Sequence, residues 1–151
     1  MLRATALCLF FAQQAAAACA PDRVTVAGDF GRANFRVAVA DDHAERSQGL
    51  MNVPDMATMQ GMLFIYDVPI SASFWMRNTL IPLDMLFADP TGTITHIHEN
   101  AVPLDETPIL GGSGVQYVLE INGGMAARLG IEIGDVLQHP AMGDAASLPC
   151  R

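Results

Sequence analysis

The chain has 151 residues, a formal net charge of −8, and only arginine among its basic side chains. This length suits one domain, and an apolar content of 51% is enough for a proper hydrophobic core. The acidic balance argues against a nucleic-acid partner, whose phosphates require a basic surface. It argues equally against electrostatic docking on anionic membranes.

Residues 1–18 are typical of a secretory signal peptide, with cleavage possible up to residue 20. Arg3 supplies a positive start, residues 4–12 form a short apolar stretch, and small alanines follow. The stretch is too short to span a bilayer, which takes a helix of about 20 apolar residues. We therefore expect a periplasmic or secreted protein with no integral membrane span, and favour this over a frayed N-terminal helix.

Two cysteines lie at the ends of the expected mature chain. Cys8 falls within the signal peptide, whereas Cys19 and Cys150 remain after cleavage. An oxidising compartment favours a disulfide between them, which could stabilise the fold by about 4–5 kcal/mol in the chain-entropy model. The alternative is a lipid anchor on Cys19, but the large apolar residue usual three positions earlier is missing. We favour the disulfide.

The first half of the chain predicts two strands and a short helix. An apolar run at 24–27 and an alternating stretch at 35–40 are typical of strands. Asp42 followed by Glu45 matches the capping box that begins a helix, and Gly49 is expected to end it.

Further strands are expected where apolar residues cluster. The run at 62–66 predicts a buried strand that ends at Asp67 and Pro69, and residues 72–76 and 83–88 predict two more.

The remaining elements are short. We expect strands at 93–98, 115–121 and 136–139, a glycine loop at 111–114, and a helix at 124–129 ended by Gly130. Many short strands with few helices predict a mainly β, compact sandwich or barrel-like single domain with one or two short helices. We place this domain at residues 24–139 and a loop-like tail at 140–151.

The apolar segment 74–87 contains four polar side chains. These are Arg77, Asn78, Thr79 and Asp84. A buried polar group without a partner costs about 1–3 kcal/mol, so such groups must be paired or line a cavity. The segment therefore predicts the position of a site.

The order of several short motifs resembles a known family, domain-of-unknown-function family 192. The motifs span most of the region from Phe35 to Gln138, and they are Arg46-Ser47-Gln48-Gly49-Leu50-Met51, Gly61-Met62-Leu63-Phe64, Met76-Arg77-Asn78-Thr79-Leu80-Ile81-Pro82-Leu83-Asp84, Tyr117-Val118-Leu119-Glu120 with Gly124, and Gly130-Ile131 with Gly134-Asp135. The resemblance implies a compact, mainly β domain that is often exported. It implies no activity, since the family has no established one.

Polar residues within or beside these motifs are the candidate ligand-binding residues: Arg46, Arg77, Asn78, Thr79, Asp84 and Glu120. They could surround one cavity in which an arginine fork holds an anionic or hydroxyl-rich ligand. The alternative, which we weigh more heavily, is a structural network in which Asp84 pairs an arginine while Asn78 and Thr79 satisfy a turn.

An enzyme is the less favoured interpretation. Asp84 and Glu120 could form the carboxylate pair of a hydrolase acting on envelope or extracellular glycans. The sequence contains no G-x-S-x-G, C-x-x-C or H-E-x-x-H motif in support of another mechanism.

Metal binding is also weakly supported, and we expect no metal or other cofactor. Met56 and Met59 could contribute thioethers to a periplasmic copper site, but methionine more often fills gaps in a core. His96 and His98 would face one side of a strand, yet zinc sites need three or four convergent ligands.

The favoured function is an exported non-catalytic binding or accessory module with a small polar cleft near Arg46, Asn78 and Asp84. Its partner would be a small molecule, a glycan or an envelope protein. Trp75 could stack on a sugar ring in this cleft or serve as a core anchor between strands.

Overall fold

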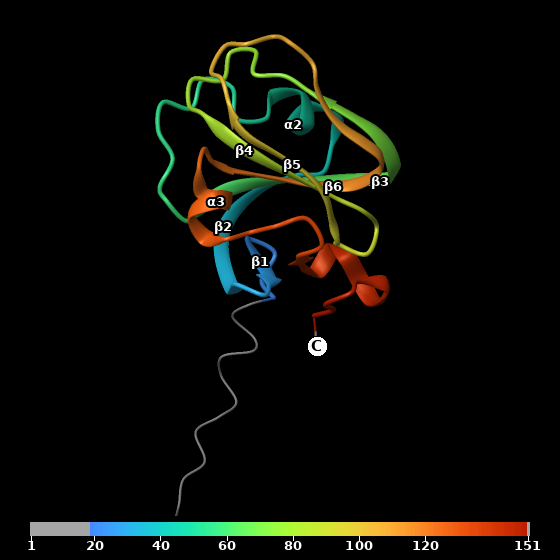
Figure 1. Cartoon of the computed structure of the whole chain (residues 1–151). Coiled ribbons are helices and arrows are strands. Elements are labelled where there is room, and N and C mark those ends of the chain that lie inside the picture. Colours follow the sequence, from blue (N-terminus) through green and yellow to red (C-terminus); the bar gives the residue numbers. More distant parts are fainter. Residues whose placement is uncertain (1–18, 151) are drawn as a thin grey trace, which may run out of the picture.

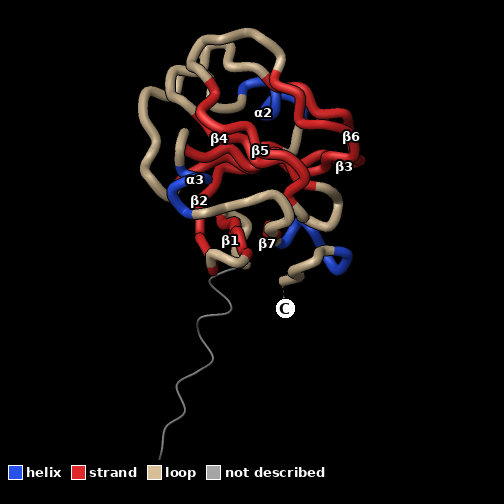
Figure 2. Tube along the Cα trace, in the orientation of Figure 1, coloured by secondary structure: helices blue, strands red, loops and turns tan. Residues whose placement is uncertain are grey.

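Seven strands form one curled sheet, a half-barrel, in the computed structural model, which describes residues 19–150 (Figures 1 and 2). The strands are β1 (Arg23–Gly28), β2 (Gly31–Ala40), β3 (Gln60–Phe74), β4 (Leu83–Ala88), β5 (Ile94–Ala101), β6 (Ile109–Asn122) and β7 (Val136–Gln138). The helical segments are α2 (His43–Gln48), α3 (Met125–Leu129) and the 3₁₀ segment η1 (Pro140–Ala145). The prediction of a mainly β, barrel-like domain with short helices is confirmed. The expected signal peptide lies outside the described residues.

The strand order is β5-β4-β6-β3-β2-β1-β7. Neighbouring strands pair antiparallel, except β2 and β3, which pair parallel. A single antiparallel bridge between Thr93 and Val136 brings β7 back towards the start of β5. The sheet is therefore curled enough for its two margins to meet at one corner.

The curled sheet separates two hydrophobic cores. The α3-side core includes Phe35, Leu63, Leu119 and Met125, and it also takes Met142 of η1. The expected loop-like tail is thus partly packed against the domain. The second cluster, here called the α2-side core, lies on the opposite face and holds residues from β3, from the loop after it, from β4 and from β6: Phe64, Met76, Leu83, Met85, Phe87 and Val118.

Strands β3 and β6 extend further than the sequence predicts. The expected end at Asp67 and Pro69 is wrong, because β3 continues through a register shift between Ile65 and Ile70. A proline is tolerated there since an irregular stretch needs no regular ladder hydrogen bond from its nitrogen.

The expected glycine loop at 111–114 is also wrong, since these residues belong to β6. A Cβ on Gly111 would lie 2.1 Å from Cδ1 of Phe87. The glycine is therefore explained by the close approach of an aromatic ring and not by a turn.

The helix α2 begins and ends where the sequence predicts, and α3 ends as predicted but begins one residue later, at Met125. In α2 the Asp42 side chain accepts a hydrogen bond from the backbone N–H of Glu45 at 2.8 Å, and the Glu45 side chain accepts in return from the Asp42 backbone. Gly49 closes α2, and Gly130 closes α3 with a φ of 79°, where a side chain would be strained.

Asp84 joins three segments of the α3 side. Its Oδ1 accepts hydrogen bonds from the backbone N–H of Asn100 at 2.8 Å and Gly124 at 2.9 Å, and its Oδ2 accepts from Ala126 at 2.8 Å. The side chain is fully buried, so these bonds replace the water that the carboxylate loses on folding. Asp84 thus fixes β5 and the start of α3 against β4.

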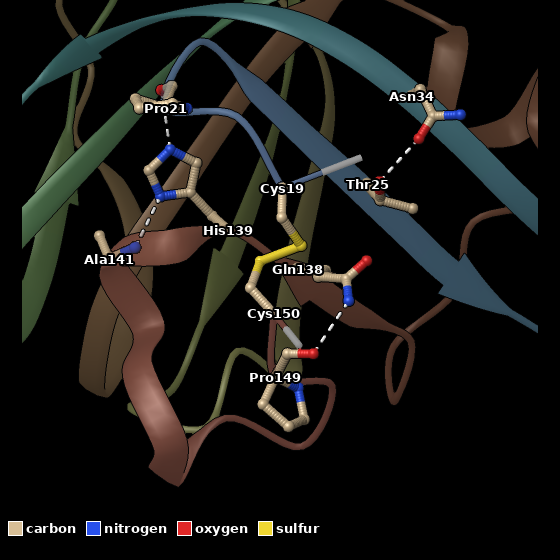
Figure 3. The surroundings of a disulfide bond; sticks show 9 residues. All are labelled: Cys19, Pro21, Thr25, Asn34, Gln138, His139, Ala141, Pro149 and Cys150. Atoms are coloured by element: carbon tan, nitrogen blue, oxygen red, sulfur yellow. Dashed lines mark hydrogen bonds between the residues drawn. A yellow bond between two sulfur atoms is a disulfide. The ribbon is translucent and has the colours of Figure 1, made fainter. Parts of the chain in front are cut away.

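The ends of the described chain are covalently joined by a disulfide between Cys19 and Cys150, as the sequence predicts (Figure 3). Their Cα atoms are 5.7 Å apart, although 131 positions separate them in sequence. His139 bridges the same region, because its Nε2 lies 2.9 Å from the Pro21 carbonyl oxygen and its Nδ1 accepts from the Ala141 backbone at 3.1 Å. Burial lowers the pKa of His139, while its hydrogen bond to Pro21 opposes that shift.

Within residues 19–150, no helix combines the length and the apolar character needed to cross a bilayer.

The substitution Asp84→Asn should lower the free energy of unfolding by roughly 2–3 kcal/mol, because the amide nitrogen would face a backbone N–H donor. Urea unfolding followed by circular dichroism measures the change. Asp105→Asn is the control: Asp105 is exposed and accepts from the Thr107 backbone, so we expect a loss within about 0.5 kcal/mol. Equal unfolding midpoints for the two variants would contradict the structural role of Asp84.

Candidate ligand-binding site

A cavity of about 280 Å³ lies beside α2 and on the α2-side face of the sheet. We call it the α2 pocket. Its walls come from α2 and the turn after it, from β3, from the loop after β3, and from β6. The lining residues are Arg46, Ser47, Gln48, Gly49, Leu50, Met51, Phe64, Tyr66, Ser73, Phe74, Trp75, Arg77, Thr79 and Glu120.

Strand register brings Glu120 into this pocket. Glu120 pairs with Met62 of β3 and Met85 of β4, and both methionines contact the α2-side core. Since side chains alternate along a strand, Glu120 shares a face with Val118, while Leu119 and Ile121 enter the α3-side core. A carboxyl group is thus placed in a row of apolar positions.

The carboxyl group of Glu120 has no hydrogen-bond or ion-pair partner among residues 19–150. Glu120 is only 4% exposed. The salt bridges of the described residues join Arg36 to Asp22 and Arg77 to Glu106, so neither includes Glu120. Burial raises the pKa of Glu120 to about 8, because the charged form would lose its hydration. At neutral pH the group therefore carries a proton and can both donate and accept a hydrogen bond.

Arg46 brings a half-buried cation to the same pocket. Its Nη1 donates to the backbone oxygen of Ile65 at 2.8 Å and to that of Asp41, and the guanidinium lies 5.0 Å from the ring centroid of Tyr66. Both hydrogen bonds use Nη1, so Nε and Nη2 have no acceptor within residues 19–150. The arginine is held in place but keeps donors for a further group.

The pKa of Tyr66 is affected by both Arg46 and Glu120. Its pKa is raised chiefly by burial; the Arg46 cation lowers it and Glu120 raises it further. Tyr66 therefore lies within electrostatic range of the two groups that face the cavity.

Trp75 and Arg77 form the outer edge of the pocket. Trp75 is 46% exposed, so it is a rim residue and not the core anchor that its apolar surroundings suggested. The Arg77 guanidinium lies 5.3 Å from the Trp75 ring centroid, and its Nε is 3.6 Å from Oε1 of Glu106. Both members of that ion pair are exposed, so it contributes little stability.

The pocket contains some of the candidate residues and omits others. Arg46, Arg77, Thr79 and Glu120 line it, whereas Asn78 and Asp84 do not. Thr79 is buried and its Oγ1 donates to the Arg77 carbonyl oxygen at 3.2 Å.

Asn78 and Asp84 serve the backbone instead. Asn78 is exposed with a φ of 52°, and its backbone carbonyl oxygen accepts from the backbone N–H of Asn52 at 2.8 Å. Asp84 bonds to α3 on the other face of the sheet, so it does not face Glu120.

The candidate metal ligands lie outside the α2 pocket. Met56 packs against the α2-side core and Met59 is exposed. His96 and His98 pair with Phe87 and Met85 and so share a strand face. Among residues 19–150, no cluster of three or more His, Cys, Asp or Glu residues is placed to hold a metal ion.

Sequence reasoning missed the aromatic wall of the pocket. Phe64, Tyr66 and Phe74 lie in apolar runs that predict core positions, and nothing in those runs marks them as pocket residues. The motif at residues 46–51 was the available signal, because all six of its residues line the cavity.

Comparisons with known proteins identify relatives but no activity. The model of the family DUF192, described as Uncharacterized ACR, matches residues 24–139. A solved protein of unknown function from Novosphingobium aromaticivorans DSM 12444 is 47% identical, with a TM-score of 0.75 over 76% of this chain and 82% of that one. A solved protein from Sinorhizobium meliloti 1021, provisionally described as a transcription regulator, is 45% identical, with a TM-score of 0.74 over 76% and 90% of the respective chains. No curated protein matches the chain.

Replacing the buried acid by its neutral isostere, Glu120→Gln, should stabilise the protein increasingly as the pH rises. The native carboxyl keeps its proton up to a pKa of about 8, whereas an unfolded glutamate loses it near the ordinary value of 4.5. The native state therefore binds more protons in this window, and the free energy of unfolding of the unsubstituted protein falls with rising pH.

The advantage of Glu120→Gln should be small at pH 5 and reach on the order of a few kcal/mol by pH 8. Urea unfolding across this range measures it. The exposed Glu106→Gln variant is the control and should follow the parent protein. A pH-independent difference between Glu120→Gln and the parent would show that Glu120 is ionised when buried.

Proposed function

The chain belongs to domain-of-unknown-function family 192, and we propose that it is an exported, non-catalytic module that binds one small molecule in the α2 pocket. The observation that carries this proposal is the carboxyl group of Glu120, which belongs to a residue only 4% exposed, lines the cavity and has no hydrogen-bond or ion-pair partner within residues 19–150. Among residues 19–150, the fully enclosed side-chain polar atom without a partner is Oε1 of Gln138, which is not in the pocket lining. The Glu120 oxygens are instead accessible through the cavity, where a ligand can reach them. A bound ligand would supply the missing partner.

The composition of the pocket supports a small polar ligand. Its volume of about 280 Å³ is near the lower end of typical ligand sites, which start at about 300 Å³. Arg46, Thr79 and Glu120 offer convergent polar groups, while Tyr66 and Trp75 offer aromatic surface. A ligand the size of a monosaccharide or a small organic acid would make both kinds of contact.

The geometry favours binding over hydrolysis. A glycoside hydrolase of the usual kind needs two carboxyl groups flanking one bond. Glu120 faces the α2 pocket, but Asp84 faces α3 and has three backbone donors. The pair that motivated a glycan hydrolase is therefore not assembled across this cavity.

The disulfide supports the exported location in this proposal. A bond between Cys19 and Cys150 persists in oxidising compartments such as the periplasm or the extracellular space. A transcription-regulating role, as in the description of the Sinorhizobium relative, is disfavoured by the net charge of −8, which is unfavourable for binding nucleic acid.

The binding role is tested by calorimetric titration with monosaccharides, sugar acids and small organic acids, after a thermal-shift screen. We expect at least one ligand to raise the melting temperature of the parent protein, because binding to the native state stabilises it. Arg46→Lys should weaken that ligand at least about tenfold, since lysine keeps the charge but loses the planar fork.

The matched control is Arg36→Lys. Arg36 is exposed and lies 3.4 Å from Asp22, away from the pocket lining, so binding should be unchanged. A screen without any hit, or a ligand bound equally by the parent and Arg46→Lys proteins, would refute a small-molecule role for the α2 pocket.

A further inference from the structure

We infer that the ligand of the α2 pocket is a small carboxylate anion whose oxygens bridge the guanidinium of Arg46 and the carboxyl group of Glu120. This inference rests on the proposed binding function and specifies its ligand class. It follows from the charges and the unused hydrogen-bonding atoms of the pocket lining.

The charged groups of the lining leave one uncompensated cation. The ionisable acid and the two arginines of the lining are Glu120, which is neutral at neutral pH, and Arg46 and Arg77. Arg77 is paired with Glu106, whereas Arg46 has no carboxylate partner among residues 19–150. A half-buried guanidinium contacting only carbonyl oxygens and a ring would gain from an anion.

The unused hydrogen-bonding atoms match the two oxygens of a carboxylate. Nε and Nη2 of Arg46 can donate to one side of the anion. The carboxyl of Glu120 can donate its proton to the other side, in the way that a neutral acid in an apolar site serves as a donor. Arg46 and Glu120 line one cavity without forming an ion pair, so a bridging group has room between them.

Within residues 19–150, the strands paired with β6 place no further charged side chain opposite Glu120. Strand β3 contributes Tyr66, and the paired positions on β3 and β4 are Met62 and Met85. The imidazoles of His96 and His98 are on β5, beyond β4. Protonation of Glu120 is therefore the expected electrostatic control of anion binding in this pocket.

Alternative ligand classes fit these groups less well. A cation would be repelled by Arg46 and Arg77, which both line the pocket. A neutral sugar could hydrogen-bond to Glu120 but would leave the Arg46 charge uncompensated. A phosphate carries about two negative charges, but only one arginine of the lining, Arg46, is without an acidic partner within residues 19–150 and so free to neutralise them.

The state of Glu120 predicts how binding should depend on pH. The pKa of this carboxyl is raised to about 8 by burial, so it is neutral at pH 6 and ionised at pH 9.5. The ionised form would repel a carboxylate and could not donate to it. Affinity should therefore be constant below pH 7 and fall about tenfold for each pH unit above 8, with a proton taken up on binding.

The experiment is isothermal titration calorimetry with two matched ligand series, at pH 6 and at pH 9.5. One series is glucuronate, glucose and glucosamine, and the other is benzoate, benzamide and benzylamine. The carboxylate of at least one series should bind best at pH 6, and its affinity should drop at least tenfold at pH 9.5. At pH 8.5, buffers of different ionisation enthalpy should reveal proton uptake.

Two variants connect this profile to the proposed contacts. Glu120→Gln keeps a donor that cannot ionise, so binding of the carboxylate should persist and lose its pH dependence. Arg46→Lys should weaken the carboxylate at both pH values while keeping the pH dependence. Thermal unfolding of each variant verifies that it is folded.

The outcomes separate the ligand class from the binding role. Stronger binding of glucose, benzamide or an amine than of the matched carboxylate would overturn the inference and leave the proposed function intact. Carboxylate binding that is unaffected by pH and by both substitutions would also overturn it. Failure of both series, together with an empty thermal-shift screen, would overturn the inference and the proposed function together.

Discussion

The fold is organised around β6, which lies between β3 and β4 and is buried on both of its faces over residues 117–121. Its side chains must therefore alternate between two separate cores. Leu119 and Ile121 pack on the α3 side, and Val118 packs on the α2 side. Glu120 follows the same alternation, so its carboxyl group enters a face that is otherwise apolar. In this position the carboxyl group is stabilised by staying protonated or by a partner that enters the cavity.

Two buried carboxyl groups lie on opposite faces of the sheet and have contrasting surroundings. Asp84 receives three backbone hydrogen bonds and uses them to hold β5 and α3. Glu120 receives no such bonds from residues 19–150 and faces a cavity that Arg46 also lines. The three hydrogen bonds to Asp84 stabilise the fold, and this structural role is enough to explain an aspartate at that position. The surroundings of Glu120 show no such structural role, and this difference distinguishes a structural acid from a candidate binding group.

Local features were predictable because their causes are local. The capping box of Asp42 and Glu45 defines the start of α2 within a few residues, and Gly130 ends α3 because its backbone is left-handed. The disulfide followed from the position of two cysteines in an expected exported chain. Each of these inferences needed only a short stretch of sequence or a composition argument.

Features that depend on pairing between distant strands were not predictable. The continuation of β3 past Pro69 requires a register shift against β6, and Gly111 is explained only by the ring of Phe87 from β4. The separation of Asp84 from Glu120 likewise depends on which residues β4 and β6 place opposite each other. Sequence patterns give the alternation within one strand but not the alignment between strands. The sequence therefore predicted only part of the pocket lining, through the motif at residues 46–51.

The joined ends of the chain lie together at the bottom of the view in Figure 1, whereas α2 is near the top. An attachment made at residue 150 would hold the domain by the margin that carries β1 and η1. The helix α2, which lines the α2 pocket, would then lie at the end of the domain far from the support. Immobilisation through that terminus suits surface-based measurements, because the anchored molecules would keep α2 away from the surface. The disulfide would keep the anchored margin intact even if neighbouring strands loosened.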